Sequence, residues 1–147
     1  MQLAFDQAKK AFEEDEVPVG CVIVYNNGNN IVASTRNLMQ QTKNPNSHAE
    51  ILAINLACLE LGNKNLSDCD IYITLEPCTM CAAAIANARL RRIYYAAADT
   101  KQGAVENGVR FFNSSSCFHR PEIYTGILEE ESVNLMQNFF NRIRNRS

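Results

Sequence analysis

Apolar residues recur along the chain with periods that alternate between helix and strand. Between Leu3 and Phe12 they return at helical spacing, which predicts an amphipathic helix at the start of the chain. Residues 17–25 and 31–35 are apolar and rich in β-branched side chains, and a turn rich in asparagine with one glycine separates them. Two strands joined by such a turn are predicted to form a hairpin.

Helices and strands then alternate to the end of the chain. We expect helices over residues 48–61, 79–88 and 129–144, strands over residues 70–75 and 92–97, and a short strand or extended segment within residues 122–128. Residues 37–47 and 99–108 are expected to be loops. This order predicts an α/β fold of three layers, α/β/α, around a central mixed sheet of about five strands. Without a linker or a repeat, residues 1–147 are expected to form one domain.

Composition restricts the class of protein. Hydrophobic residues make up 46% of the chain and charged residues 20%, which is typical of a globular protein and not of a disordered one. The net charge of −2 produces no global positive field, so any binding of nucleic acid must depend on a local patch. No segment is as long and apolar as a signal peptide or a membrane span, and we expect a cytoplasmic protein without membrane contact.

The six cysteines are unlike one another in their spacing. In a reducing compartment they are not expected to form disulfides. Only Cys78 and Cys81 are closely paired, which favours a metal or catalytic role for these two. The isolated ones are expected to be small buried hydrophobic residues: Cys21, Cys58, Cys69 and Cys117.

Two short motifs stand where helices are predicted to begin, and each has an ordinary interpretation. Ser47 and Glu50 enclose His48 in the pattern of a capping box. Pro77 precedes a C-x-x-C motif, which taken alone can be redox-active, structural or accidental.

The two motifs together indicate a zinc site. Cys78 and Cys81 are three residues apart, so both thiolates can face one point at a helix start, and His48 adds a third ligand. Three protein ligands leave one position for water, as in catalytic zinc sites. Glu50 can serve the same site only if the site lies beyond the helix end, with two helix N-termini converging on it. There Glu50 would move protons between the zinc-activated water and the leaving nitrogen.

The combination H-x-E and P-C-x-x-C resembles the known signature of zinc-dependent nucleobase deaminases, which have the cytidine deaminase-like fold. A longer match resembles the bacterial tRNA-specific adenosine deaminases, and its segments are residues 17–20, Asn37, residues 48–50, 74–81, 99–104 and 119–122. This resemblance implies hydrolytic deamination of the wobble adenosine to inosine, one Zn²⁺ per chain, a tRNA anticodon stem-loop as partner, and a homodimer.

The resemblance also implies roles for four further residues. Asn37 would hydrogen-bond the flipped-out adenine, Asp99 would lie near a ribose, and Val19 would form a pocket wall. Phe140, together with its neighbour Phe139, would lie near the anticodon loop. Alternative interpretations are a turn residue for Asn37, a loop residue for Asp99, a core strand residue for Val19 and helix core for the phenylalanines.

Contacts to tRNA phosphates need basic side chains, because the net charge does not provide them. Candidates are Arg89, Arg91, Arg92, Lys101, Arg142, Arg144 and Arg146. Three other functions remain open from the residues: deamination of a free guanine- or cytosine-type base or nucleotide, a non-catalytic RNA-binding subunit stabilised by zinc, and a redox protein. The redox alternative leaves His48 and Glu50 unexplained, and silent subunits tend to lose the glutamate.

Overall fold

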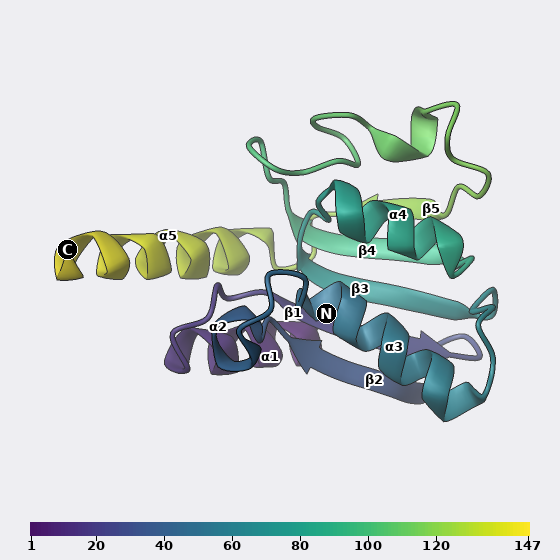
Figure 1. Ribbon diagram of the computed structural model, residues 1–147, viewed down its shortest axis with the longest axis horizontal. Coiled ribbons are helices and arrows are strands. Elements are labelled where there is room, and N and C mark those ends of the chain that lie inside the picture. Colours follow the sequence, from purple (N-terminus) through teal and green to yellow (C-terminus); the bar gives the residue numbers. More distant parts are fainter.

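The computed structural model describes residues 1–147 and shows a five-stranded sheet between layers of helices (Figure 1). The helices are α1 (Gln2–Glu13), α2 (Met39–Thr42), α3 (Ala49–Leu61), α4 (Thr79–Asn87) and α5 (Glu129–Arg146), with a 3₁₀ turn η1 at Phe111–Asn113. The strands are β1 (Gly20–Tyr25), β2 (Asn30–Arg36), β3 (Cys69–Leu75), β4 (Arg92–Ala97) and β5 (Glu122–Thr125). The sheet order is β2-β1-β3-β4-β5.

The sheet is mixed, as expected. β1 pairs antiparallel with β2 and β3, whereas β3, β4 and β5 are parallel to one another. The expected fold class, a mixed sheet of about five strands with flanking helices, is therefore confirmed.

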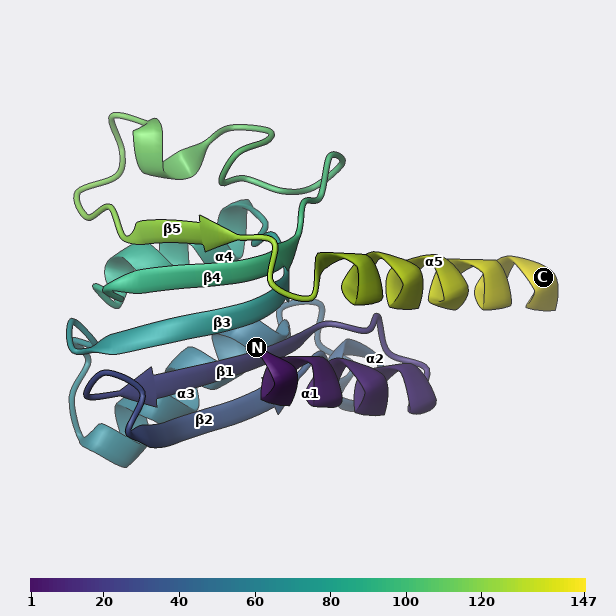
Figure 2. The same cartoon turned by 180° about the vertical axis from the view of Figure 1, so that it is seen from behind.

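The helices cover the two faces unequally. α3 and α4 lie side by side on one face, and α1 lies on the other, as the two opposite views show (Figures 1 and 2). The main core lies under α3 and α4, where Ile73 of β3 belongs to the same buried cluster as Ala53 and Ile85 of these helices. α5 projects beyond the ends of the strands and contacts α1 through Phe139 and Phe12, whose rings lie 6.2 Å apart.

The packing of α1 on the sheet requires a glycine at position 20. A Cβ atom there would overlap the carbonyl oxygen of Ala4 and lie 2.7 Å from the amide nitrogen of Ala8. Since both atoms belong to the backbone, no side-chain truncation would relieve the contact. Gly20 therefore sets how closely α1 approaches β1.

The strand directions bring the candidate site residues to one edge of the sheet. β2, β3, β4 and β5 run in the same direction, so their carboxyl ends meet at the edge where β1 begins. The segments that follow these ends carry Asn37, the cysteine motif and Asp99. Ligands commonly bind at this edge in α/β sheets.

Three local features differ from the expectation. The segment 37–47 contains the short helix α2, and η1 was not predicted. β1 starts at Gly20 instead of residue 17, because Pro18 lacks an N–H group and the amide of Val19 donates a hydrogen bond to the carbonyl of Val17.

No helix combines the length and apolar character needed to cross a membrane.

Candidate functional site

His48, Cys78 and Cys81 form one cluster of potential metal ligands. Their ligand atoms all lie within 4.8 Å of one another. Nδ1 of His48 is 3.7 Å from Sγ of Cys78 and 3.5 Å from Sγ of Cys81. One imidazole nitrogen and two thiol sulfurs converging on a point are a donor set that suits a tetrahedral metal ion of zinc type.

Two helix starts produce this convergence. His48 is the N-cap residue of α3, Cys78 is the N-cap residue of α4, and Cys81 lies in the first turn of α4. Both helices therefore direct their N-terminal dipoles toward the cluster, which favours negative charge there. The expected convergence of two helix N-termini is confirmed.

The capping-box interpretation of residues 47–50 is wrong. No side chain of His48 or Ser47 caps α3, and the hydroxyl of Ser47 instead accepts a hydrogen bond from Thr42 at 2.9 Å. The free amide of Ala49 donates to Oδ1 of Asn37 at 2.8 Å. Asn37, in the loop after β2, thus caps α3 in place of a residue next to the helix. Its amide nitrogen remains free to bind a ligand.

The surroundings of the two cysteines shift the pKa values of their thiols in opposite directions. A hydrogen bond from the Cys81 thiol is the main influence that lowers the pKa of Cys78 to about 4, and His48 adds to it against the effect of burial. The same hydrogen bond, burial and the nearby Glu50 carboxylate raise the pKa of Cys81. The hydrogen bond to Cys78 raises the pKa of His48. Without a metal, these shifts therefore favour a thiolate at Cys78 and a thiol at Cys81.

Glu50 lies beside this cluster in the first turn of α3 and is only 4% exposed. Burial raises its pKa and outweighs both its own backbone N–H and the positive charge of His48, which act in the opposite direction. A carboxyl group with a raised pKa next to a metal site is suited to accept and return a proton.

The cluster opens into a cleft of about 1100 Å³. His48, Cys78 and Glu50 line it together with apolar residues from the strand ends. The four residues that the resemblance suggested as substrate-binding also line it: Val19, Asn37, Asp99 and Phe140. The structure thus brings seven of the eight predicted site residues to one cavity, and the eighth, Cys81, is buried beside it in the ligand cluster.

α5 forms a wall of the cleft, and here the structure separates two neighbours. Phe139 is 2% exposed and packs against Phe12, whereas Phe140 is 41% exposed and lines the cleft. Arg144 of this wall was already a candidate for phosphate contacts, whereas sequence reasoning missed its other members: Val133, Met136, Gln137 and Asn141. Their helical spacing marks one face of α5, but spacing alone does not say what that face contacts.

Most of the candidate phosphate-binding residues are engaged within the protein. Carboxylates hold four of the seven: Arg91 with Asp70, Arg92 with Glu122, and Arg142 and Arg146 with Asp15. Arg89 is exposed but does not line the cleft. Lys101 and Arg144 line the cleft without a carboxylate partner, so they are the cations best placed for a polyanion.

Sequence reasoning also gave no role to Glu76, which lines the cleft and is 3% exposed. Burial is the largest single influence on its carboxyl group and opposes ionisation. Hydrogen bonds from the amide of Asp99, the side chain of Asn107 and further backbone amides together outweigh burial and lower the pKa of Glu76. Glu76 is therefore a buried carboxylate with its charge fully solvated by the protein.

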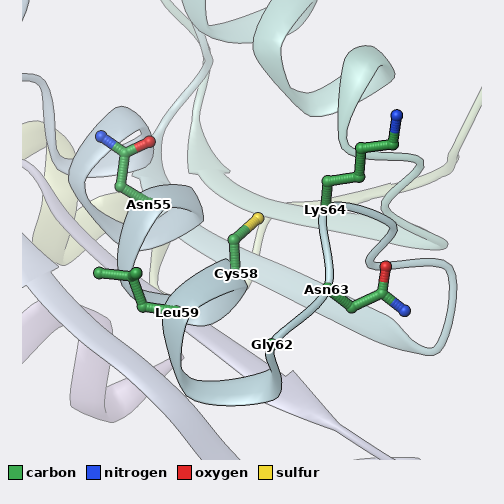
Figure 3. A pocket seen from close by; sticks show the side chains of 6 residues that line it. All are labelled: Asn55, Cys58, Leu59, Gly62, Asn63 and Lys64. Atoms are coloured by element: carbon green, nitrogen blue, oxygen red, sulfur yellow. The ribbon is translucent and has the colours of Figure 1, made fainter.

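A second hollow lies at the C-terminal end of α3, away from the metal-ligand cluster (Figure 3). Its lining residues are Asn55, Cys58, Leu59, Gly62, Asn63 and Lys64. The polar ends of Asn55, Asn63 and Lys64 point in different directions and do not converge on a common point. This hollow therefore lacks the arrangement of a catalytic site.

Comparisons with known proteins agree with the geometry. The profile of the MafB19-like deaminase family matches residues 1–144. A tRNA-specific adenosine deaminase of Rickettsia typhi is 56% identical over 98% of this chain and 97% of its own length. A solved structure from work on A-to-I editing by tRNA:A34 deaminases is 49% identical, has a TM-score of 0.89, and aligns over 92% of this chain and 96% of its own. A guanine deaminase structure from Bacillus subtilis is 30% identical, with a TM-score of 0.64 over 95% and 90% of the two chains.

Metal binding to this cluster is expected to release protons, because the thiol of Cys81 and a protonated His48 must lose theirs to become ligands. Calorimetric titration of metal-free protein with Zn²⁺, in buffers of different ionisation enthalpy, should show release of about one proton or more per ion near pH 7. Affinity should fall as the pH is lowered. The Cys58→Ser variant should behave like the unchanged protein, and an affinity independent of pH between about 6 and 8 would contradict the assignment.

Proposed function

The chain belongs to the MafB19-like deaminases and to the tRNA-specific adenosine deaminases, one of which is 56% identical to it. From this membership we propose that it converts the wobble adenosine of a tRNA anticodon to inosine. The observation that carries the proposal is the cluster of His48, Cys78 and Cys81 beside a buried Glu50 in one open cleft. One deaminase domain over residues 1–147, assembly as a homodimer and a cytoplasmic location belong to the same proposal, with family membership as their support.

Zn²⁺ is the proposed cofactor, one per chain, held by Nδ1 of His48 and the sulfurs of Cys78 and Cys81. Two thiolates and an imidazole are the ligand types that zinc prefers, and three ligands leave a position for water. The bound metal supplies a Lewis acid that makes water a stronger nucleophile at neutral pH.

Glu50 is proposed to move the protons of the reaction. Its carboxylate takes a proton from the attacking water as oxygen bonds to C6 of the adenine. It delivers this proton to the ring nitrogen, then takes the second proton from the new hydroxyl group on C6 and passes it to the amino group, which leaves as ammonia as its bond to C6 breaks and the C6 carbonyl forms. The raised pKa of Glu50 supports both directions of transfer, because a carboxyl group with a pKa nearer neutrality accepts and donates protons more evenly.

The substrate contacts follow from which groups remain free in the cleft. Because the oxygen of Asn37 accepts from Ala49, its amide nitrogen is the group proposed to hydrogen-bond the adenine. Val19 is proposed as an apolar wall beside the base, and Asp99 as a contact to ribose at the rim. Phe140 is proposed to stack on a nucleotide of the anticodon loop, and its exposed ring supports this role.

The direct test is inosine formation in an anticodon stem-loop with adenosine at the wobble position. Purified zinc-loaded protein is expected to release ammonia from this RNA and not from free guanine or cytosine. A stem-loop with guanosine at the same position serves as the control. Turnover of the free bases alone would replace the proposal with the free-base alternative, and tight RNA binding without ammonia release would favour a non-catalytic subunit.

The Glu50→Gln variant is expected to keep its metal and lose activity by at least about 10²- to 10⁴-fold, because the amide cannot carry the proton. Inosine formation and zinc content would be measured on the same preparation. Glu60→Gln makes the same chemical change at an exposed position of the same helix and should leave activity unchanged. Full activity of the Glu50→Gln variant would refute the assigned role.

The Phe140→Ala variant is expected to raise KM for the stem-loop by about 5- to 150-fold, because stacking of one base on an aromatic ring contributes on the order of 1–3 kcal/mol. Steady-state kinetics on the stem-loop would measure the change. Phe118→Ala is the matched control, since this ring is 85% exposed and does not line the cleft. Equal KM values for the two variants would show that Phe140 does not contact the RNA.

A further inference from the structure

Glu76 lies between the segment that carries Cys78 and the loop of residues 99–107. It follows β3 directly and comes two residues before Cys78, where α4 begins. Its buried carboxylate accepts five hydrogen bonds, and all of them come from residues 99–107, which we call the rim loop. Oε1 accepts from the amide of Asp99 at 3.0 Å and from Nδ2 of Asn107 at 2.7 Å. Oε2 accepts from the backbone amides of Val105, Glu106 and Asn107 at 3.0, 3.0 and 3.1 Å.

The rim loop supplies one side of the cleft. Asp99, Lys101 and Gln102 line it, and Oδ1 of Asp99 in turn accepts from the amides of Lys101 and Gln102 at 3.0 Å each. The loop has only one regular backbone link to the metal-ligand segment, an isolated bridge between Cys78 and Gly103 in which the amide of Ala104 donates to Pro77 at 2.9 Å. The Glu76 carboxylate is therefore the principal attachment of the loop beside this bridge.

Gly103 shows how closely the loop encloses the carboxylate. A Cβ atom at this position would overlap the carbonyl of Asp99 and lie 2.5 Å from Cδ of Glu76. The loop backbone thus wraps around the carboxylate at a distance that only glycine permits. This close approach is a second observation, beside the hydrogen bonds, that the loop packs tightly around the Glu76 side chain.

We propose that Glu76 is a positioning residue for substrate binding, and that its carboxylate fixes the rim loop so that Asp99, Lys101 and Gln102 meet the RNA. All the hydrogen bonds of the Glu76 carboxylate come from the loop and none from a metal ligand, so its effect passes through the loop. The kinetic part of this inference rests on the proposed function. Loss of the carboxylate is expected to weaken binding of the stem-loop far more than it slows the chemical step.

Glutamine is the sharpest replacement because it keeps the shape of the side chain and changes only the hydrogen-bonding pattern. All five partners of Glu76 are donors, and an amide presents a donor of its own to part of them. The Glu76→Gln variant should therefore raise KM for the stem-loop by about 10- to 100-fold, keep kcat within about threefold, and keep its zinc. Glu60→Gln is the matched control at an exposed position.

A reciprocal exchange separates this role from a general effect on folding. Asn107→Asp alone places a second carboxylate against Glu76 and should raise KM by repulsion. In the double variant Glu76→Gln, Asn107→Asp, the new amide can donate to the new carboxylate, and its oxygen can still accept from the backbone amides of residues 105–107. The double variant is therefore expected to bind the stem-loop better than either single variant.

Amide hydrogen exchange tests the inference without any activity. In Glu76→Gln the amides of Asp99, Val105, Glu106 and Asn107 should exchange at least about tenfold faster, whereas the amide of Glu76, which donates to Ala97, should be unchanged. Unchanged exchange in the loop, an unchanged KM, or loss of zinc with a fall in kcat alone would each overturn the proposal. If Glu76→Gln does not fold, Asn107→Ala removes one donor and must raise KM for the proposal to stand.

These readouts also distinguish this inference from the proposed function. If the unchanged protein does not deaminate the stem-loop, the proposed function fails, and the exchange experiment still decides whether Glu76 holds the rim loop.

Discussion

Helices α3 and α4 begin next to each other at the carboxyl ends of the strands, and the rest of the site depends on this placement. Each helix presents a metal-ligand type as its N-cap residue, His48 in α3 and Cys78 in α4. Two helix dipoles then favour the negative charge of thiolates at one point. The parallel direction of β2 to β5 is what brings both starts, and the segments around them, to the same edge of the sheet.

Two buried glutamates lie near this point, and their surroundings shift their pKa values in opposite directions. Glu50 is surrounded by few donors, so burial raises its pKa and prepares it for proton transfer. Glu76 has five donors, so its pKa is lowered and it keeps a fixed charge that can hold a loop. The number of hydrogen bonds, and not burial itself, separates a carboxyl group that can move protons from one that serves as an anchor.

The residue pattern alone predicted a large part of this protein. Periods of apolar residues located most helices and strands, because burying one face of a helix or strand demands that spacing wherever the element lies. The types and spacing of His48, Glu50, Cys78 and Cys81 were sufficient for a zinc-type site, because few chemistries need these four residues together. The resemblance over most of the chain supplied the substrate class, which neither composition nor periodicity demands.

Tertiary structure decided what depends on distant partners. Asn37 caps α3 in place of Ser47, although Ser47 lies next to the helix, because the free amide of Ala49 points toward the loop after β2. Phe139 and Phe140 are adjacent and chemically identical, yet one is core and the other lines the cleft, since α5 packs on α1 with one side only. A sequence displays its charges but not their pairing, so only the folded chain showed which arginines are engaged and that Glu76 has five donors.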